Sequence, residues 1–343
     1  MNDRNGIAHE ESHDPAGRRD RQADPMTVAA LPHVGIAEVR AAHRRIAPFV
    51  HRTPLARSAT LDAELGAGVL FKCENLQKVG AFKARGALNA VLSLSDEDAA
   101  RGVVTHSSGN HGQALAYAAS QRAVRCTVVM PETAPAVKLD AVRGYGATVV
   151  LCAHAEREQA TARIRDEEGS ILVHPFNDPA VIAGQGTAAL EMLEDVPDLD
   201  VIVAPIGGGG LMSGTSVAAR SHARHIRLIG AEPERVDDAA RSLASGELLP
   251  GVENPDTIAD GLLTGLGTRT FDIMRAAAVG VVTVTEAAIR NAASFHLFRM
   301  KLLVEPSGAV GLAAVRAIAD ELVGCKVGVI ISGGNTDLAW LTG

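Results

Sequence analysis

A lysine beside a glycine-containing loop is the first residue of this chain with the type and position for covalent chemistry. Lys83 lies where the loop around Gly80 runs into small, helix-forming residues, so we expect it at or just inside a helix start. Its neighbours Phe82 and Ala84 form an apolar wall, which lowers the pKa of an amine because it disfavours the charged form. Such an amine can form a Schiff base. Because a lysine at a helix start is more often solvated, the rest of the sequence must support this prediction.

Four consecutive glycines form a second element, between an apolar run and an expected helix over Leu211–His222. They are Gly207, Gly208, Gly209 and Gly210. Backbone N–H groups at such a turn converge on a phosphate at the helix N-terminus, and residues without a β-carbon allow its close approach. A tight turn alone needs only one or two glycines, so the run predicts a phosphate site. It is not a P-loop, because no lysine precedes Ser213, and no acidic ribose ligand is placed for a dinucleotide.

A polar loop over Ser107–Gly112 joins an expected strand over Val103–His106 to an expected helix over Gln113–Arg122. It presents two hydroxyls, an amide and backbone N–H groups at the carboxyl end of a strand, where ligands bind in open α/β sheets. Such a loop can clamp a carboxylate. Helix capping by Ser108 or Asn110 is an equally good interpretation of the loop alone.

Acidic residues follow another expected strand, over Arg227–Glu232. The carboxylates of Glu232 and Asp238, with the carbonyl of Val236, could supply oxygen ligands to a hard divalent cation whose shell is completed by waters. On composition alone, acidic residues at a strand end are more often simply solvated.

Apolar runs that lack alternation, each followed by a helical stretch, predict an α/β fold with strands covered on both faces. We expect two open parallel-sheet α/β domains, the smaller (99–174, about four strands) inserted in the larger (31–98 and 175–343). Residues 1–30 are polar and lack apolar periodicity, which predicts a disordered leader, with Met26 as an alternative start. The other expected helices are Ile36–Ile46, Val137–Gly144, Glu156–Glu168, Ile182–Asp195, Glu286–Lys301 and Ser307–Leu322, and a long loop is expected over Gly246–Gly267. The other expected strands are Val69–Glu74, Cys126–Met130, Ala147–Cys152, Ile171–His174, Val201–Pro205 and Val327–Ile331.

Composition excludes several function classes. The chain has 343 residues, a formal net charge of −7 and 3% aromatic residues, which argues against a nucleic-acid surface. No apolar run approaches the roughly 18 residues of a membrane span. The four cysteines include no C-x-x-C pair, so we expect neither a zinc site nor a disulfide framework and predict a reducing, cytoplasmic location.

Lys83, the Ser107–Gly112 loop, the four glycines and the turn Ser332–Asn335, in this order, resemble pyridoxal-5′-phosphate (PLP) enzymes of fold type II. The chain is similar to the serine/threonine dehydratase (threonine ammonia-lyase) and serine racemase family over about residues 36–340. The resemblance implies PLP as cofactor, bound by Phe82, Lys83, Asn110, Gly207, Gly208, Gly209, Gly210 and Ser332. A serine such as Ser332, facing the pyridine nitrogen, shares only a neutral hydrogen bond, so the ring is a weaker electron sink than one facing an aspartate.

The resemblance also implies how the site divides its work. Lys83 is the Schiff-base lysine, and in relatives that racemise, a serine at the place of Ser108 acts on the opposite face of the substrate. Residues implied to contact the substrate are Ser107, Ser108, Asn110, His111, Arg157 and Thr264. Racemase-like relatives place Mg²⁺ or Ca²⁺ at positions matching Glu232, Val236 and Asp238.

The function that the resemblance implies is dehydration and deamination of L-threonine or L-serine to a 2-oxo acid and ammonia. Alternatives are serine racemisation alone or beside dehydration, which Ser108 permits, and dehydration of 3-hydroxyaspartate, where Arg157 could bind the second carboxylate. A catalytically silent PLP-binding protein is the alternative from a different class. We expect a homodimer without nucleic-acid or membrane partners, and no C-terminal regulatory domain because eight residues follow Asn335.

Overall fold

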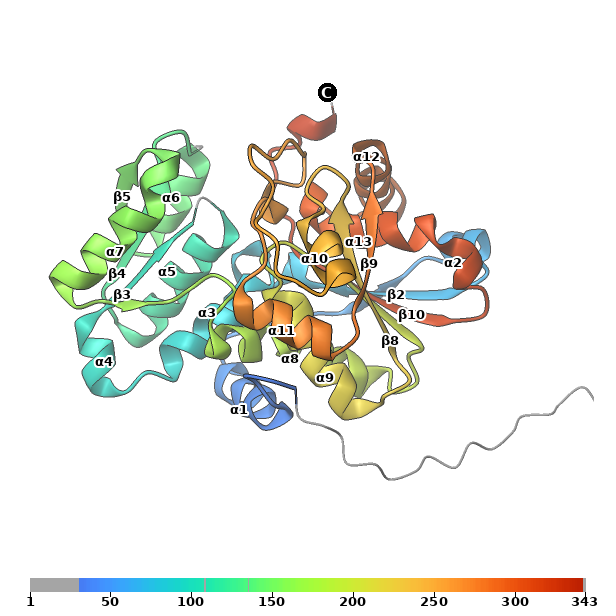
Figure 1. Cartoon of the computed structure of the whole chain (residues 1–343), viewed down its shortest axis with the longest axis horizontal. Helices are drawn as coiled ribbons and strands as arrows, with labels where there is room; N and C mark the ends of the chain where they lie inside the picture. The colour runs from blue at the N-terminus through green and yellow to red at the C-terminus, as the bar shows by residue number, and fades with distance from the viewer. Residues whose placement is uncertain (1–30, 108, 135, 342–343) are drawn as a thin grey trace, which may run out of the picture.

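Two parallel sheets, each covered by helices, lie side by side in the computed structural model (Figure 1). The structure describes residues 31–341 apart from 108 and 135. The predicted disordered leader, residues 1–30, therefore lies outside the described residues. The expected α/β architecture with two open parallel sheets is confirmed.

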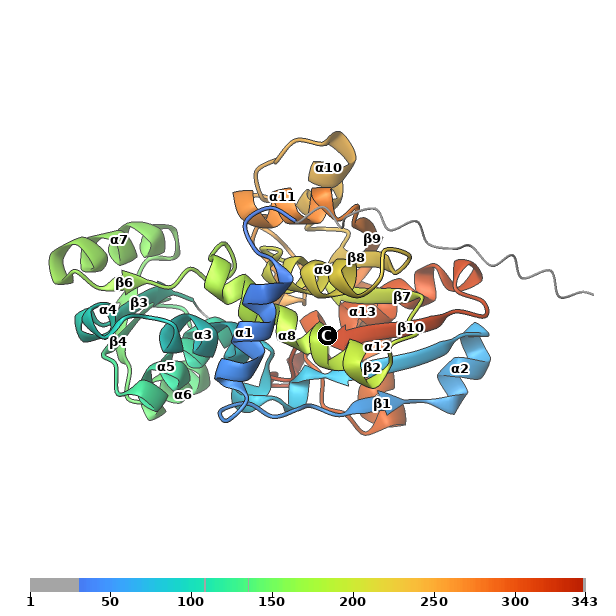
Figure 2. The same cartoon turned by 90° about the horizontal axis from the view of Figure 1, so that it is seen from below.

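The smaller sheet has the strand order β5-β4-β3-β6, and all its strands are parallel. Its strands are β3 (Val103–His106), β4 (Cys126–Pro131), β5 (Thr148–Cys152) and β6 (Ile171–Leu172). Its helices are α4 (Asp96–Arg101), α5 (Asn110–Arg122), α6 (Ala136–Gly144) and α7 (Arg157–Glu168). Helix α7 covers one face, and α5 and α6 cover the other (Figure 2). Both faces are therefore apolar, which explains why strand β4 is buried at every residue.

The larger sheet has the order β1-β2-β10-β7-β8-β9. Its strands are β1 (Leu55–Arg57), β2 (Gly68–Cys73), β7 (Val201–Pro205), β8 (Arg227–Pro233), β9 (Gly280–Val284) and β10 (Lys326–Ile331). Its helices are α1 (Ile36–Ile46), α2 (Ala59–Leu65), α3 (Lys83–Leu92), α8 (Pro179–Asp195), α9 (Gly210–His222), α10 (Asp238–Ser245), α11 (Thr268–Ala276), α12 (Glu286–Ser294) and α13 (Pro306–Ala317). Only the short edge strand β1 runs antiparallel, to β2. Parallel strands β2, β10, β7 and β8 thus point their carboxyl ends toward one edge.

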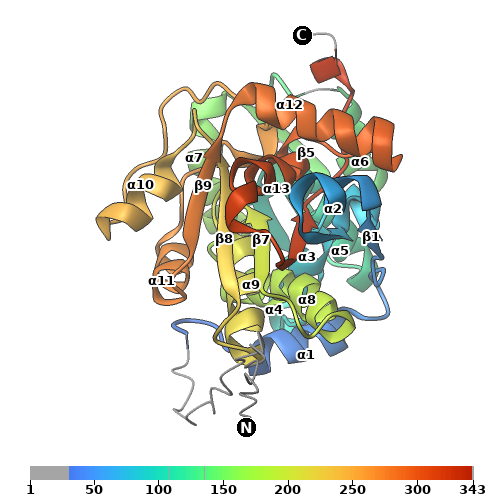
Figure 3. The same ribbon diagram turned by 90° about the vertical axis from the view of Figure 1, so that its right-hand side faces the viewer.

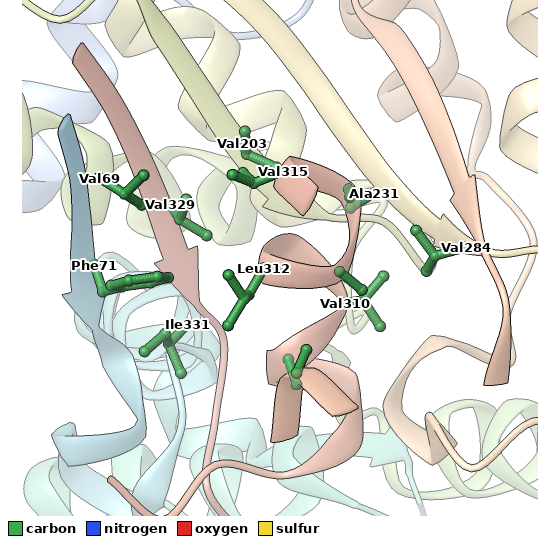
Figure 4. Packing of buried hydrophobic residues seen from close by; sticks show 14 of the residues in the cluster. Val69, Phe71, Val203, Ala231, Val284, Val310, Leu312, Val315, Val329 and Ile331 are labelled. Carbon is green, nitrogen blue, oxygen red and sulfur yellow. The ribbon is translucent and has the colours of Figure 1, made fainter. Parts of the chain in front are cut away.

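The core of the larger sheet has two layers. Helix α13 packs on one face, with α12 outside it, while α8 and α9 pack on the other face (Figure 3). Leu312 and Val310 of α13 point at the sheet, where Phe71 and Ile331 come from neighbouring strands (Figure 4). Because successive side chains of a strand alternate in direction, Ile330 belongs to the opposite layer.

Several expected elements were wrong in extent or were not predicted. The helix expected over Glu286–Lys301 is α-helical only to Ser294 and continues as a π-helix over Phe295–Met300, and Lys301 closes it with a positive φ of 61°. Helix α13 ends at Ala317, before the expected Leu322. The sequence did not predict β9, α2, α4, α10 or α11, which are short or lie at the edge of the molecule.

The chain crosses between the two sheets twice, through α3 and α4 and again between β6 and α8. The domain limits at residues 98/99 and 174/175 stay a prediction. Within the described ranges, no helix combines the length and the apolar character needed to cross a membrane.

Candidate active site

A cavity of about 830 Å³ lies between the two sheets and is lined by residues of both. Its lining includes every described residue that was predicted to contact cofactor or substrate: Phe82, Lys83, Ser107, Asn110, His111, Arg157, Gly207, Gly208, Gly209, Gly210, Thr264 and Ser332. Ser108, predicted to be catalytic and to bind substrate, lies outside the described residues. The fold therefore brings together residues that are up to 250 positions apart in the chain, from Phe82 to Ser332.

Lys83 is the first residue of α3, as predicted. Its Nζ donates a hydrogen bond to the backbone O of Pro175 at 2.9 Å and lies 5.2 Å from the centre of the Phe82 ring. Burial lowers the pKa of the Lys83 amine to about 8, against the opposing effect of the Glu305 carboxylate. The N–H of Phe82 donates to the carbonyl of Ser332 at 3.0 Å, which ties the lysine to the end of β10. Near neutral pH this amine is deprotonated more readily than an exposed lysine and can act as a nucleophile or base.

The glycine run joins the end of β7 to the start of α9. Gly209 has a φ of +84°, which favours glycine, and a β-carbon on Gly208 would lie 2.2 Å from the ring of Phe176. The hydroxyl of Thr270 donates to the carbonyl of Gly208 at 2.8 Å and holds the turn. All four glycines line the cavity at a helix N-terminus, the geometry that suits a phosphate group.

Asn110 and His111 lie in the first turn of α5, which starts three residues earlier than the sequence predicted. The Asn110 Nδ2 donates to both Glu305 oxygens, at 2.9 Å and 3.2 Å. Its Oδ1 accepts a hydrogen bond from Asn335 Nδ2 at 2.9 Å. The Ser107 hydroxyl accepts from the N–H of Gly109 at 3.2 Å. These bonds orient the loop at the helix N-terminus, where a carboxylate is electrostatically favoured.

His111 is buried and carries no charge near neutral pH. Burial holds the pKa of its ring well below the usual range, and the charge of Lys83 lowers it further. Its Nε2 lies 3.2 Å from the carbonyl of Val173 and so donates, which leaves Nδ1 as a buried acceptor without a hydrogen-bond donor among the described residues. A ring in this state does not attract a carboxylate. If His111 contacts the substrate carboxylate as predicted, its backbone N–H is the group that can do so.

Arg157 and Thr264 enter the cavity from opposite sides. Arg157 begins α7 of the smaller sheet and is half-buried, which lowers the pKa of its guanidinium. Thr264 is exposed in a loop of the larger sheet. Between these sides, Lys138 of α6 forms a 2.8 Å ion pair with Asp260. The cavity is thus bridged by a salt bridge that the sequence did not predict.

Sequence reasoning also missed Glu305 and the role of Asn335. Glu305 is 3% exposed and lines the cavity. It stands as a single acidic residue between the apolar run 302–304 and Pro306, which is a signal for a buried, partnered carboxyl. Asn335 was part of the Ser332–Asn335 turn, but only the fold reveals its contact with Asn110.

The predicted cation ligands lie at the end of β8 and the start of α10, outside the cavity lining. The Glu232 carboxylate accepts hydrogen bonds from the N–H groups of Ala239 and Ala240, both at 3.0 Å. Burial raises the pKa of Glu232 to about 8 and also raises that of Asp238, whose buried Oδ2 accepts no hydrogen bond from the residues that the structure describes. Two buried carboxyls and one orphaned oxygen fit a hard cation. The described residues contain no group of three His, Cys, Asp or Glu side chains that could hold a metal, so a cation here would also need the carbonyl of Val236 and water.

Comparisons with known proteins agree with this geometry. Residues 46–333 match the protein family described as "Pyridoxal-phosphate dependent enzyme". The serine racemase of Dictyostelium discoideum is 49% identical over 323 residues, which cover 92% of this chain and 98% of that protein. The β-hydroxyaspartate dehydratase of Paracoccus denitrificans is 46% identical over 88% of this chain and 96% of that protein.

Among solved structures, the processed form of threonine deaminase isoform 2 from Solanum lycopersicum superimposes with a TM-score of 0.86. It is 30% identical and covers 94% of this chain and 92% of that chain. The lysine at a helix start, the glycine turn and the serine at the end of β10 meet in the cavity as the sequence resemblance implied. The chain belongs to the family of PLP-dependent enzymes of fold type II.

Proposed function

We propose that this enzyme eliminates water from a β-hydroxy amino acid, L-threonine or L-serine, and that uptake of water by the resulting enamine yields a 2-oxo acid and ammonia. The observation that carries the proposal is the Lys83 amine, which lies in one cavity with the glycine turn and Ser332. The reaction needs a base at the substrate Cα and a conjugated electron sink. Residues of this cavity are suited to provide the base and to bind a cofactor that acts as the electron sink.

The residues present fit PLP. The N–H groups of Gly207, Gly208, Gly209 and Gly210 would hold its phosphate, Ser332 would face its ring nitrogen, and the Asn110 amide would bind its 3′-oxygen. A β-carbon on Gly208 would overlap the ring of Phe176, so only glycine fits at this position of the turn, and the turn lines the cavity at the N-terminus of α9. When bound, PLP supplies the electron sink that makes the Cα proton of an amino acid acidic.

The chain's own groups then divide the work. The carboxylate of the substrate would lie at the N-terminus of α5, near Ser107 and the N–H of His111. The Lys83 amine, with a pKa of about 8, takes the Cα proton. The Cα–H electron pair moves to form the Cα–Cβ double bond as the Cβ–O bond breaks, and the hydroxyl leaves as water after gaining a proton. The released enamine takes up water and becomes the 2-oxo acid and ammonia.

Two further activities of the same site are candidates. Serine racemisation is supported by the 49% identical serine racemase and needs a second proton donor, for which Ser108 is the predicted group. Dehydration of 3-hydroxyaspartate is supported by the 46% identical dehydratase and by the position of Arg157 on the cavity wall, where a guanidinium could bind a second carboxylate.

The test is to incubate the purified enzyme with PLP and, separately, L-serine, L-threonine and 3-hydroxyaspartate, and to assay 2-oxo acid, ammonia and D-serine. Formation of 2-oxo acid from serine or threonine supports the proposal. D-serine without pyruvate would replace it by racemisation, and turnover of 3-hydroxyaspartate alone would replace it by the third activity. A colourless protein with no turnover would favour the silent PLP-binding alternative.

We further propose that Glu232, Asp238 and the carbonyl of Val236 hold Mg²⁺ or Ca²⁺. The unpartnered Asp238 Oδ2 and the raised pKa of both carboxyls support this, because a cation would stabilise their charged forms. Each cation should raise the melting temperature of the wild type and leave that of Glu232→Gln unchanged. An equal rise in both proteins would contradict the site.

We also propose a cytoplasmic homodimer. All four cysteines are free, which supports a reducing compartment. The side chains of Phe298 (62% exposed) and Leu303 (45% exposed) are large apolar groups at the surface and support a contact with a second chain. Sedimentation of the wild type and of Phe298→Glu would test the dimer.

A further inference from the structure

Glu305 is a buried carboxyl on the cavity wall that the proposed reaction does not use. It occupies the N-cap position of α13, yet its side chain makes no capping hydrogen bond. Both carboxylate oxygens instead accept from Asn110 Nδ2, across 195 positions of sequence. The Glu305 side chain therefore contacts Asn110 in place of the N-terminus of its own helix.

The contacts of Asn110 define what Glu305 does. The Asn110 Oδ1 accepts from Asn335 Nδ2 at 2.9 Å, and the same Asn335 group donates to the carbonyl of Val79 at 2.7 Å. The two Glu305 oxygens lie 2.9 Å and 3.2 Å from Asn110 Nδ2, a geometry in which they can share one of its N–H groups. The amide can therefore not flip without losing both partners, and its second N–H is left for a ligand.

The backbone at Gly333 fixes the position of the Glu305 carboxyl. The N–H of Glu305 donates to the carbonyl of Gly333 at 3.1 Å. A β-carbon on Gly333 would lie only 2.5 Å from Glu305 Oε1, so the glycine after Ser332 makes room for this carboxyl. The turn that carries Ser332 and the residue that orients Asn110 are thus packed as one unit.

The charged groups around Glu305 come from three other elements. Burial has the largest effect on the pKa of Glu305 and raises it. Asp260, before the loop of Thr264, raises it further, whereas the hydrogen bond from Asn110 and the charge of Lys138 on α6 lower it. The resulting pKa of Glu305 is about 7. In return the Glu305 carboxylate raises the pKa of Lys83. Glu305 and Lys83 line the same cavity, which places the carboxylate within electrostatic reach of the amine.

We propose that Glu305 is a positioning residue of the cofactor site: with Asn335 it fixes the Asn110 amide so that the remaining N–H serves the cofactor's 3′-oxygen, and its negative charge favours the protonated form of Lys83. This inference rests on the PLP site proposed above. It assigns Glu305 no contact with substrate.

The first test measures cofactor affinity of the full-length enzyme by its visible absorption. Glu305→Gln keeps the shape and one acceptor oxygen but loses the charge, and we expect PLP affinity to fall about tenfold. The loss should disappear when Asn110 is already alanine, because Glu305 acts through that amide. An unchanged affinity, or an equal loss in the Asn110→Ala background, would overturn the positioning role. Glu97→Gln, an exposed carboxyl on α4, is the matched control.

The second test needs no turnover. The rate of acetylation of Lys83 in the cofactor-free full chain is measured by mass spectrometry across pH 6 to 10. Loss of a nearby negative charge in Glu305→Gln should lower the apparent pKa of Lys83 by about one unit, with no shift in Glu97→Gln. A purely structural role for Glu305 would leave that titration in place and would overturn the electrostatic half.

The two proposals fail separately. If no substrate is turned over, the proposed reaction fails, while PLP affinity and the Lys83 titration still report on Glu305. If Glu305→Gln melts at a much lower temperature, Asn335→Ala provides the independent route, since it breaks the other hydrogen bond of Asn110. Wild-type PLP affinity of Asn335→Ala would then overturn the positioning role.

Discussion

Helix α3 carries two cations, Lys83 and Arg85, whose pKa values are shifted in opposite directions. Arg85 is fully buried among carboxylates: it bonds both oxygens of Glu74, at 2.7 Å and 2.8 Å, and both oxygens of Glu191, at 2.7 Å and 2.9 Å. Burial alone would lower the pKa of Arg85, but these carboxylates raise it above its ordinary value. In the described part of the chain no carboxylate pairs with Lys83, and burial lowers its pKa.

The difference shows that burial lowers the pKa of a cation where no carboxylate is hydrogen-bonded to it. Lys72 is also fully buried and forms a 2.7 Å ion pair with Glu191. The positive charges of Lys72 and Arg85 are thus matched by the negative charges of Glu74 and Glu191 in one buried network. That network ties β2, α3 and α8 together. It holds the helix that presents Lys83, while Lys83 itself stays available for chemistry.

Replacing the reactive cation has the largest expected effect. Lys83→Ala should remove the visible absorption band of bound PLP and lower kcat by about a thousandfold or more, because base and Schiff-base partner are lost together. Absorption spectra and steady-state assays measure both. Lys326→Ala, which breaks a surface ion pair, should keep the band. A Lys83→Ala protein with full activity would refute the assigned role.

Breaking the paired network should instead cost stability. Glu191→Gln leaves Lys72 and Arg85 with too little negative charge, and we expect the free energy of unfolding to fall by about 3–5 kcal/mol. Glu194→Gln, on the same helix but in an exposed pair with Arg52, should change it by less than about 1 kcal/mol. Denaturant titration of both variants decides, and equal losses would contradict the difference drawn between buried and exposed pairs.

A buried histidine without partners extends the comparison to pH. His296, in the π-helical segment, packs against Phe71, and within the described part of the chain neither ring nitrogen has a hydrogen-bond partner. Burial lowers its pKa to about 3. Below about pH 6.5 the His296 ring therefore binds a proton in the unfolded state but stays neutral in the folded state. This group's stabilising contribution is present above that pH and declines as the pH falls toward 3.

His296→Leu should remove that decline, by up to about 1.4 kcal/mol per pH unit between pH 6 and 4. Unfolding free energies of variant and wild type at several pH values measure the slope. If the two slopes coincide, His296 is not buried in its neutral form.

The smallest effect is expected at the ion pair that bridges the cavity. Lys138 and Asp260 are 23% and 53% exposed, so Asp260→Asn should change the free energy of unfolding by less than about 1 kcal/mol. Denaturant unfolding checks this value. A loss as large as that of Glu191→Gln would mean that this pair is far less solvated than its exposure indicates.

Local signals predicted many residues of the site but not the hydrogen bonds that connect them. The glycine run was found from its own neighbourhood, whereas Lys83 needed the support of the other motifs and Ser332 was identified only through the family resemblance. The start of α5 was placed too late, because Asn110 and His111 look like loop residues until a helix N-terminus is seen to form there. Glu305 was missed, since its partner is 195 positions away.

By itself the sequence determined which turns bear reactive or phosphate-binding groups and that two parallel sheets would carry them, because strand and helix periodicity are local properties. Only the tertiary structure decided which charges are paired. Arg85 meets Glu191 across 106 positions, whereas the Lys83 amine, as far as the described residues go, donates to the carbonyl of Pro175 and pairs with no carboxylate. Two cations of one helix thus acquire different chemistry because packing, not sequence distance, sets the dielectric and the counter-charge around each.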